Sequence, residues 1–267
     1  MPLVGALYVP NAPFLIAPRA FEGRGATTAA TLQSLNIAGR FHPDAVVVAT
    51  PHWVSTDRFL VQSSARPPQV RDFSGFPPAV STVEYRPPGD PGLAAQLVDA
   101  GTRAGVPVSR SEEWGLDHGA WAPLLNLLPA ARTPTVPLSI TPFPPAAHLR
   151  WGEVIGQVLA QTPQRSLFIG TGSILHAFSR YQPSSDARWA EGAAWEQEIA
   201  VLARDRRLDE LLAFDRRKWA QLEPEGQLAP LFMLLGSLDP TLRGRIVATE
   251  QLHGAFGMTV LEYSRDT

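Results

Sequence analysis

The chain has 267 residues, a mass of 29.0 kDa and a formal net charge of -2. Hydrophobic residues make up 45% and charged residues 18%, which is the composition of a globular protein with a substantial core. The near-neutral charge excludes a nucleic-acid-binding protein that depends on a broad basic surface. The absence of cysteine excludes disulfides, thiolate nucleophiles and cysteine-bound metals.

No apolar segment is long enough to cross a membrane, and the N-terminal sequence MPLVGALYVP lacks the basic region of a signal peptide. We therefore expect a soluble, cytoplasmic protein that binds neither a membrane nor nucleic acid. Lys218 is the only lysine and no motif surrounds it, so we expect no lysine-based chemistry.

Apolar runs alternate with segments of helical spacing along the chain. The runs predict strands at 4–9, 45–50, 59–62, 106–109, 135–140, 166–170, 245–248 and 258–263. The helical spacing predicts helices at 27–39, 93–105, 118–128, 146–161, 187–204 and 227–238. The segment 65–91 is rich in proline and is expected to be largely irregular.

This alternation predicts an α/β sandwich with a mainly parallel central sheet, because helices connect parallel strands. The run AVVVAT (45–50) is typical of a central strand that is covered on both faces. No repeat divides the sequence, so we expect residues 1–267 to form a single domain. The 26 prolines cluster between the predicted elements, which predicts long Pro-rich loops at the strand ends.

Three histidines follow a predicted strand or begin a predicted helix. His52 comes after AVVVAT, His118 lies in GLDHGAWAPL (115–124), and His176 follows the strand SLFIG within GTGSILHAF (170–178). Residues at the carboxyl ends of parallel strands face the crevice where α/β proteins bind ligands, so these imidazoles are predicted to share one pocket. On pattern alone, a structural and a functional role fit them equally well.

Other patterns near these histidines exclude some chemistry and leave some open. GTGS is not a dinucleotide-binding loop, because Leu175 stands where a further glycine is required. Ser173 lacks the flanking glycine of a nucleophile elbow. Nearby tryptophans either line an aromatic substrate pocket or belong to the core, namely Trp53, Trp114 and Trp121. The remaining histidines are expected to be structural or surface residues, namely His42, His148 and His253.

Motifs shared with one protein family extend over nearly the whole chain. They are VPNAPFLIAP, VVVATPHW, DFSGFPPAV with GDP after it, GLDHGAWAPL, GTGSILHAF and QLAPLFMLLGSLDP. Through these motifs the chain resembles the superfamily of class III extradiol ring-cleavage dioxygenases, and most closely its DOPA-dioxygenase-like branch. The combination of GLDHGAWAPL with DFSGFPP is the most specific part of the resemblance.

The resemblance implies a non-haem metal enzyme that opens catechol-type aromatic rings, with Fe(II) or, in some members, zinc. By the matching motifs, His52 corresponds to the second metal ligand, His118 to the acid/base histidine and His176 to an additional active-site histidine. We therefore assign His118 and His176 as catalytic. Trp53 and Asp117 are assigned to substrate binding. The family also implies a small aromatic substrate and a homodimer.

Two of the three ligand positions that the resemblance implies carry amides. Asn11 stands where the family has its first histidine, and Gln227 stands at the third ligand position, counted back from Gly236. Neutral amides are weak ligands for Fe(II) and carry no charge to offset the cation. A degenerate or remodelled metal site is therefore expected, in which Glu223 or Glu225 can substitute for Gln227.

Two functions remain open at this point. In the first, a remodelled site retains ring-cleaving activity on a catechol-like aromatic. In the second, the protein holds no metal and binds an aromatic or peptide ligand, or uses His118 and His176 for acid/base chemistry. Both predict that five side chains line one cleft at an edge of the sheet, namely Asn11, His52, His118, His176 and Gln227.

Overall fold

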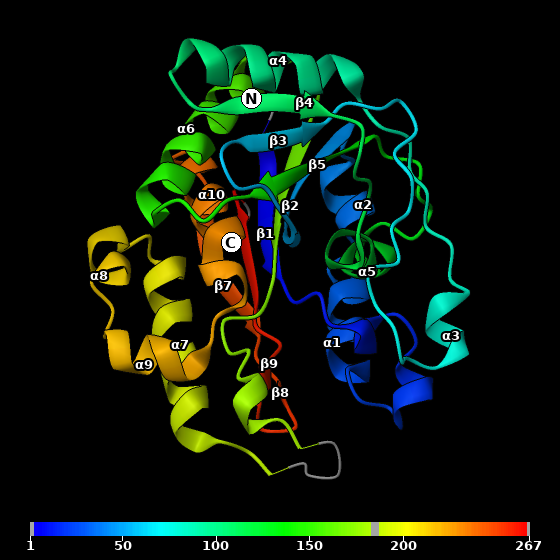
Figure 1. The fold of residues 1–267 in the computed structure, drawn as a ribbon, viewed down its shortest axis with the longest axis vertical. Coiled ribbons are helices and arrows are strands. Elements are labelled where there is room, and N and C mark those ends of the chain that lie inside the picture. The colour runs from blue at the N-terminus through cyan, green and yellow to red at the C-terminus, as the bar shows by residue number, and fades with distance from the viewer. Residues whose placement is uncertain (1–2, 183–186, 266–267) are drawn as a thin grey trace.

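A large β-sheet lies at the centre of the computed structural model, which describes residues 3–182 and 187–265 (Figure 1). Its strands are β1 (Leu3–Val9), β2 (Ala45–Val54), β3 (Phe59–Gln62), β4 (Val108–Ser111), β5 (Thr135–Ile140), β6 (Ser166–Thr171), β7 (Arg243–Ala248) and β10 (Val260–Ser264). The spatial order of the strands is β4-β3-β5-β2-β6-β1-β10-β7. A separate antiparallel pair joins β8 (Gln251–Leu252) to β9 (Phe256–Gly257).

The centre of the sheet is parallel. β5, β2, β6 and β1 pair in parallel, whereas β10 and β7 are antiparallel at one edge. At the other edge, β3 runs antiparallel to β5 and parallel to β4. The predicted α/β fold with a mainly parallel sheet is therefore confirmed. Since β2, β6 and β1 are adjacent and run the same way, their carboxyl ends meet at one edge of the sheet.

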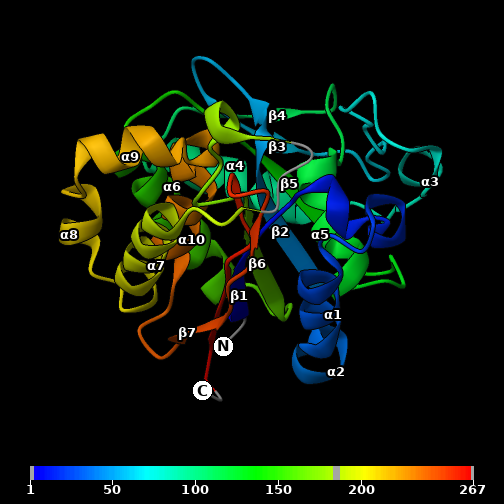
Figure 2. The same ribbon diagram turned by 90° about the horizontal axis from the view of Figure 1, so that it is seen from below.

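Helices cover both faces of this sheet. The α-helices are α1 (Ala26–Ser34), α2 (Ile37–Phe41), α3 (Pro78–Ser81), α4 (Pro91–Arg103), α5 (His118–Leu127), α6 (Pro145–Gln161), α7 (Ala190–Arg204), α8 (Leu208–Leu212), α9 (Arg216–Leu222) and α10 (Ala229–Ser237). Short 3-10 helices are η1 (Pro13–Leu15), η2 (Pro18–Phe21), η3 (Phe178–Arg180) and η4 (Glu225–Leu228). α1, α2 and α5 lie on one face, α6, α7 and α10 lie on the other, and α4 lies beside β3 and β4 (Figures 1 and 2).

The sequence of β2 explains why both faces are covered. Its side chains alternate between two apolar cores, with Val46 and Val48 in the core under α1 and α5, and Val47 and Ala49 in the core under α6 and α10. All four side chains are fully buried. At about 25 cal/mol per Å² of buried apolar surface, such a strand contributes several kcal/mol to folding.

Glycines bring α6 and α10 into close contact. A Cβ atom at Gly152 would lie 2.1 Å from the carbonyl oxygen of Met233, and one at Gly236 would lie 2.2 Å from that of Leu149. The two helix backbones therefore touch at positions where any larger residue would separate them. This contact holds α10, and with it the start of η4, against the sheet.

Two predicted helices differ from the structure because of left-handed residues. The segment 27–39 forms α1 and α2 instead of one helix, since Asn36 between them has a φ of 46°. The segment 227–238 becomes α-helical only at Ala229, because Gln227 and Leu228 have φ values of 53° and 58°. The prediction that Gln227 opens the α-helix is therefore wrong.

Other predicted boundaries differ from the structure by a few residues. β2 continues beyond Thr50 to Val54, so that His52 and Trp53 lie within the strand. The strand predicted at 106–109 lies at Val108–Ser111. The short elements α3, α8, α9, β8 and β9 were not predicted, since so few residues show no clear periodicity.

Glu196 is an acidic side chain that is buried without an ion pair among the described residues. Glu196 on α7 is 3% exposed and accepts a hydrogen bond of 2.6 Å from the hydroxyl of Thr259. Gly257 makes room for it, because a Cβ there would lie 2.1 Å from the Glu196 Oε1 atom. Burial is the main cause that raises the pKa of Glu196 to about 7.

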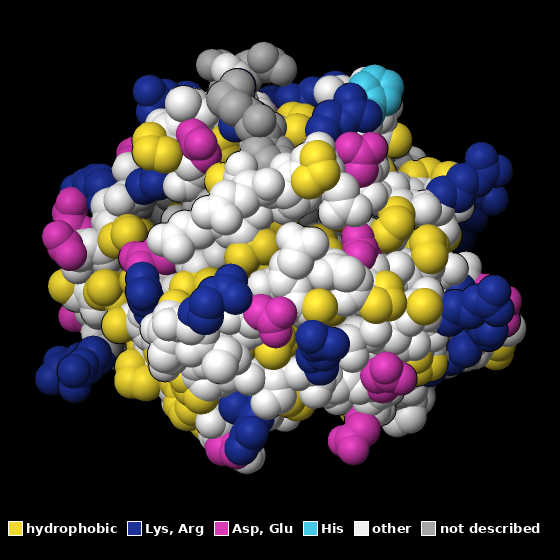
Figure 3. All heavy atoms as spheres, turned by 90° about the horizontal axis from the view of Figure 1, so that it is seen from above, with side chains coloured by type: hydrophobic (Ala, Val, Ile, Leu, Met, Phe, Trp, Pro, Cys, Tyr) yellow, Lys and Arg dark blue, Asp and Glu magenta, His cyan; other side chains and the backbone are white. Residues whose placement is uncertain are grey.

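The surface of the described chain carries both signs of charge. At the end of the molecule where α4 lies, basic side chains stand among Asp and Glu side chains (Figure 3). No helix within the described ranges combines the length and apolar character that crossing a bilayer requires.

Candidate functional site

Five polar side chains from separate segments converge where β1, β2 and β6 end. Asn11 follows β1, His52 lies near the end of β2, His176 follows β6, His118 begins α5, and Glu225 begins η4. All five line one cavity of about 360 Å³. Four of the five side chains predicted to share a cleft therefore do so, and the fifth position is taken by Glu225 in place of Gln227.

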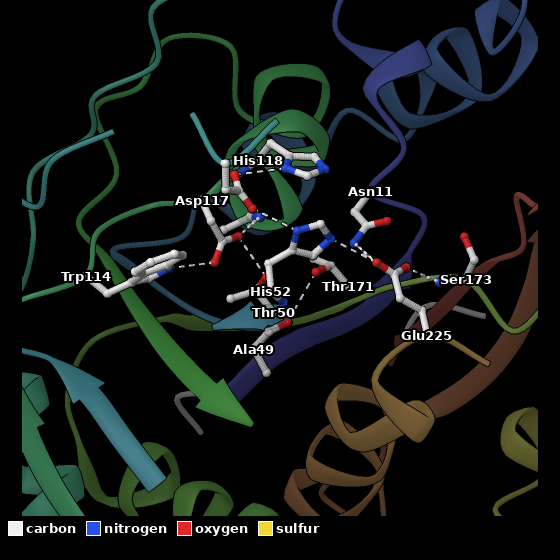
Figure 4. Close-up of polar contacts among 12 residues, drawn as sticks. Asn11, Ala49, Thr50, His52, Trp114, Asp117, His118, Thr171, Ser173 and Glu225 are labelled. Atoms are coloured by element: carbon white, nitrogen blue, oxygen red, sulfur yellow. Dashed lines mark hydrogen bonds and ion pairs between the residues drawn. The ribbon is translucent and has the colours of Figure 1, made fainter. Parts of the chain in front are cut away.

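His52 lies at the centre of a chain of hydrogen bonds. Its Nδ1 atom is 2.8 Å from Oδ2 of Asp72, and its Nε2 atom is 2.9 Å from Oε1 of Glu225 (Figure 4). Both ring nitrogens thus contact a carboxylate. Because each partner comes from a different loop, the imidazole has a fixed orientation.

Asp72 joins His52 to His118. The Oδ1 atom of Asp72 accepts from the backbone N–H of His118 at 2.9 Å and also lies 2.9 Å from the Nδ1 atom of His118. The two imidazole rings meet edge to face, with centroids 4.1 Å apart. Since Nδ1 of His118 is engaged by Asp72, its Nε2 atom is left to interact with a ligand in the cavity.

Glu225 is held by three groups. Its Oε1 atom accepts a hydrogen bond of 3.0 Å from the side-chain amide of Asn11, in addition to the contact with His52. Its Oε2 atom accepts a hydrogen bond of 3.0 Å from the backbone N–H of Ser173. A dashed line marks this contact in Figure 4. These contacts come from the loops after β1 and β6 and from the end of β2, so the carboxylate lies where the three strand ends meet.

These contacts shift the proton affinities of all three groups. Burial opposes the charged form of His52, but its hydrogen bonds to Asp72 and Glu225 outweigh burial and raise its pKa to about 10. Burial also opposes ionisation of Asp72, yet hydrogen bonds from His118 and His52 hold its pKa well below the ordinary range. The pKa of Glu225 is lowered to about 2, because His52, His176 and Asn11 together outweigh its burial. These contacts therefore favour the charged forms of His52, Asp72 and Glu225.

His176 reaches the cavity from the loop after β6. Its backbone N–H donates to the carbonyl oxygen of Leu222 at 2.8 Å, and the residue forms an isolated bridge with Phe256. Its ring lies edge to face with Phe178, with centroids 4.8 Å apart. Its charge contributes to the low pKa of Glu225, so the two side chains interact across the cavity.

Asp117 does not face the cavity, which corrects its assignment to substrate binding. Its carboxylate is fully buried and accepts hydrogen bonds from Thr50, the Trp114 indole and the backbone N–H of Ala120. The contact with Ala120 makes Asp117 the N-cap of α5. Asp117 therefore fixes the start of the helix that presents His118.

The tryptophans do not line the cavity either, so the assignment of Trp53 to substrate binding is also wrong. Trp53 is 5% exposed and Trp121 is fully buried, while Trp114 donates its indole N–H to Asp117. Their side chains fill the core, where large aromatic residues are most often found. The aromatic lining instead comes from loop residues, namely Phe14, Phe73, Phe76, Phe178, Tyr181 and Phe256.

Gln227 lies outside the cavity lining, which corrects its expected place in the cleft. Its side chain is exposed, and its Oε1 atom accepts a hydrogen bond of 2.8 Å from the indole N–H of Trp219. The left-handed turn at Gly226 and Gln227 directs Glu225 to the cavity instead. Glu223 also stays away, because it hydrogen-bonds Ser179.

The three remaining histidines do not line the cavity, in agreement with the expectation that they are structural or surface residues. They are His42, His148 and His253.

Asp72 is the functional residue that pattern reasoning missed. It lies in DFSGFPP, one of the motifs on which the family resemblance rests, inside the Pro-rich segment. A carboxylate in such a motif was the signal available for it.

The donor atoms of this site fit a divalent metal ion. Two imidazoles and a carboxylate are the donor set of mononuclear non-haem iron sites, and the cavity lining contains such side chains in His52, His176 and Glu225. Ligand atoms of His52, Asp72 and His118 also lie within 4.8 Å of one another and form a group that can hold a metal. Partners of Nδ1, such as Asp72 on His52, are the kind of contact that orients a metal-binding imidazole.

Comparison with known proteins identifies the family of this chain. Residues 26–258 match the family described as the catalytic LigB subunit of aromatic ring-opening dioxygenase. The chain belongs to this family, the class III extradiol dioxygenases, as the motifs predicted.

Individual relatives carry related names. The chain is 28% identical to a 4,5-DOPA dioxygenase extradiol of Beta vulgaris, over 83% of this chain and 81% of the relative. It is 38% identical to a protein of the same name from Escherichia coli (strain K12), over 50% of this chain and 48% of the relative, so that match spans about half of either protein. A solved structure, the uncharacterized protein JW3007 from Escherichia coli K12, superposes with a TM-score of 0.75 at 20% identity and covers 97% of this chain and 99% of the other. The last comparison confirms the fold.

Proposed function

We propose that this protein opens a catechol-type aromatic ring with O₂, using Fe²⁺ held by His52, His176 and Glu225 with the Asn11 amide beside them. Both oxygen atoms of O₂ enter the product, so the reaction requires no further reductant. When bound, the ion supplies the site at which the catechol oxygens and O₂ meet and exchange electrons. Zn²⁺ fits the same donors but has no redox chemistry, so it is the weaker candidate.

The observation that carries the proposal is the placement of Glu225. Its largely buried carboxylate lies 2.9 Å from Nε2 of His52 and 3.0 Å from the amide of Asn11. It thereby supplies the negative charge that Asn11 and Gln227 lack. The site is remodelled in this view, with a carboxylate that comes from a position two residues before Gln227.

His118 is the acid/base group of the proposed reaction. Asp72 engages its Nδ1 atom, which leaves Nε2 to accept a proton from a catechol hydroxyl and return it later. Phe73 packs edge to face against the ring, with centroids 5.2 Å apart, and keeps it in place. The backbone N–H contact to Asp72 fixes the distance between the helix start and the carboxylate.

The test is anaerobic calorimetric titration of Fe²⁺ into the wild type, Glu225→Gln and Glu223→Gln. Glu223 is the matched control, because it precedes Glu225 by two residues and hydrogen-bonds Ser179 outside the cavity lining. We expect Glu225→Gln to weaken Fe²⁺ binding at least tenfold and Glu223→Gln to leave it unchanged. Equal affinity in the wild type and Glu225→Gln would contradict the proposed ligand set.

A metal-free aromatic-binding protein is the second candidate. The observation in its favour is that His52 lies between Asp72 and Glu225, so that its protonated form offsets one of their two negative charges without a metal ion. A wild type that binds no Fe²⁺ at neutral pH and consumes no oxygen with any catechol, yet still binds catechols, would favour this second function. In the first function, by contrast, metal binding must release the proton from His52, so that Fe²⁺ affinity rises with pH.

A further inference from the structure

We infer that the substrate is a catechol bearing an uncharged, apolar alkyl or aryl substituent and no carboxylate. This inference rests on the proposed function and names the substrate class for the same cavity. It follows from the size of the cavity, the chemistry of its walls and the positions of the arginines around it.

The cavity is larger than a catechol ring requires. A cavity of about 150 Å³ is enough to hold benzene, whereas this one measures about 360 Å³. The polar groups gather at the strand ends around His52 and Glu225, so the hydroxyl-bearing edge of the ring belongs there. The remaining volume is left for a substituent larger than a hydroxyl or methyl group.

Aromatic side chains form the walls of that remaining volume. Phe178, Tyr181 and Phe256 contact one another edge to face or tilted, with centroid distances of 5.1 to 6.4 Å. Phe73 and Phe76 form a second aromatic contact, with centroids 5.6 Å apart. Rings packed in this way offer apolar surface to a substituent, and apart from the hydroxyl of Tyr181 these rings carry no hydrogen-bond donor.

The aromatic residues near the mouth are unusually exposed for their type. Phe178 is 59% exposed and Phe76 is 37% exposed, and both line the cavity. A cluster of exposed apolar side chains that borders a cavity marks a binding surface. An apolar substituent that extends from the ring toward the mouth would cover these side chains.

The charges around the cavity disfavour an anion. No arginine or lysine is among the described residues that line it, and the chain outside the described ranges contains neither residue type. Arg180, two residues after Phe178, stacks on the Trp189 ring at 3.9 Å, and Arg71, next to Asp72, donates to the carbonyl oxygen of Val83. The carboxylates of Asp72 and Glu225 both face the cavity, and the imidazoles of His52 and His118 are already paired with them. A substrate carboxylate would therefore be desolvated near like charges, with His176 as the remaining imidazole of the lining.

The test compares three catechols that differ only in the group at the end of a two-carbon side chain at ring position 4. They are 4-propylcatechol with its methyl group, dopamine with its ammonium group, and 3,4-dihydroxyphenylpropionate with its carboxylate. Binding is measured anaerobically to the metal-loaded and the metal-free protein, and oxygen uptake is measured separately. We expect 4-propylcatechol to bind at least tenfold more tightly than dihydroxyphenylpropionate, with dopamine between them.

Variants at the mouth test the cause of the preference. Phe178→Arg should tighten binding of dihydroxyphenylpropionate severalfold and weaken that of 4-propylcatechol, whereas Phe178→Leu should leave the order unchanged. Leu212→Arg is the matched control, because Leu212 is 46% exposed on α8 and lies outside the cavity lining. It adds the same charge elsewhere and should change neither affinity.

The outcomes separate the two proposals. Equal or tighter binding of dihydroxyphenylpropionate to the wild type would overturn the inference about the substrate class. Absence of oxygen uptake with every catechol would overturn the proposed function, while the anaerobic binding order would still decide the inference.

Discussion

The pH dependence of stability should depend strongly on Glu196. This buried carboxyl has a pKa of about 7, compared with an ordinary value of 4.5. Because its pKa is raised in the folded state, the native protein binds the proton more tightly than the unfolded chain does. The contribution of Glu196 is therefore fully present below about pH 4.5 and is lost as the pH rises through about 7.

The size of the effect follows from the two pKa values. The difference between 4.5 and about 7 corresponds to about 3 kcal/mol, at about 1.4 kcal/mol for each pH unit. Glu196→Gln removes the titration and keeps an oxygen that can accept from the hydroxyl of Thr259. The variant should match the wild type at pH 5 and exceed its unfolding free energy by about 2 to 3 kcal/mol at pH 8.

Urea unfolding at pH 5 and pH 8 measures this double difference. Glu198→Gln is the control, because Glu198 lies on the same helix, is exposed and pairs with Lys218 at 2.9 Å. The unfolding free energy of Glu198→Gln should differ from that of the wild type by less than about 1 kcal/mol, and by the same amount at both pH values. If the wild type and Glu196→Gln lose the same free energy between the two pH values, the raised pKa of Glu196 is wrong.

Two further predictions concern the cavity, and a third concerns a buried hydroxyl. Asn11→His should raise Fe²⁺ affinity at least tenfold in anaerobic titration. Gln227→His should leave the affinity unchanged, since Gln227 contacts Trp219 outside the cavity lining. An equal gain in both variants would refute the placement of Gln227. His118→Ala should lower any turnover about a hundredfold or more while Fe²⁺ binding and the unfolding midpoint stay near those of the wild type; a variant that unfolds, yet has wild-type activity per folded molecule, would make His118 structural. The hydroxyl of Tyr8 is buried without a hydrogen-bond partner among the described residues. In urea unfolding, Tyr8→Phe should therefore be as stable as the wild type or more stable by about 1 kcal/mol. A loss of stability above about 1 kcal/mol would show that the hydroxyl has a partner.

Much of the fold was predictable from local patterns. The run 45–50 and the strand β5 were visible in the sequence because β-branched and apolar residues fill both faces of central parallel strands. The predicted clustering of His52, His118 and His176 followed from the same logic, since residues after adjacent parallel strands lie close together.

The rest depended on single backbone conformations. Gln227 was expected at a helix start, but a left-handed turn at Gly226 and Gln227 places Glu225 at the site instead. Periodicity carries no information about such a turn. Asp72 lies in an irregular loop, where only the folded chain brings a carboxylate between His52 and His118.

The long separation along the chain between the contacting residues of the site has a practical consequence for experiments. Asn11 and Glu225, which hydrogen-bond each other, are 214 positions apart, and His52 lies 173 positions from Glu225. A ligand that binds these groups recognises only the native chain, so it raises the melting temperature according to its concentration and affinity. Thermal-shift screening of metal ions and catechols therefore reports on the complete site directly, before any product has been identified.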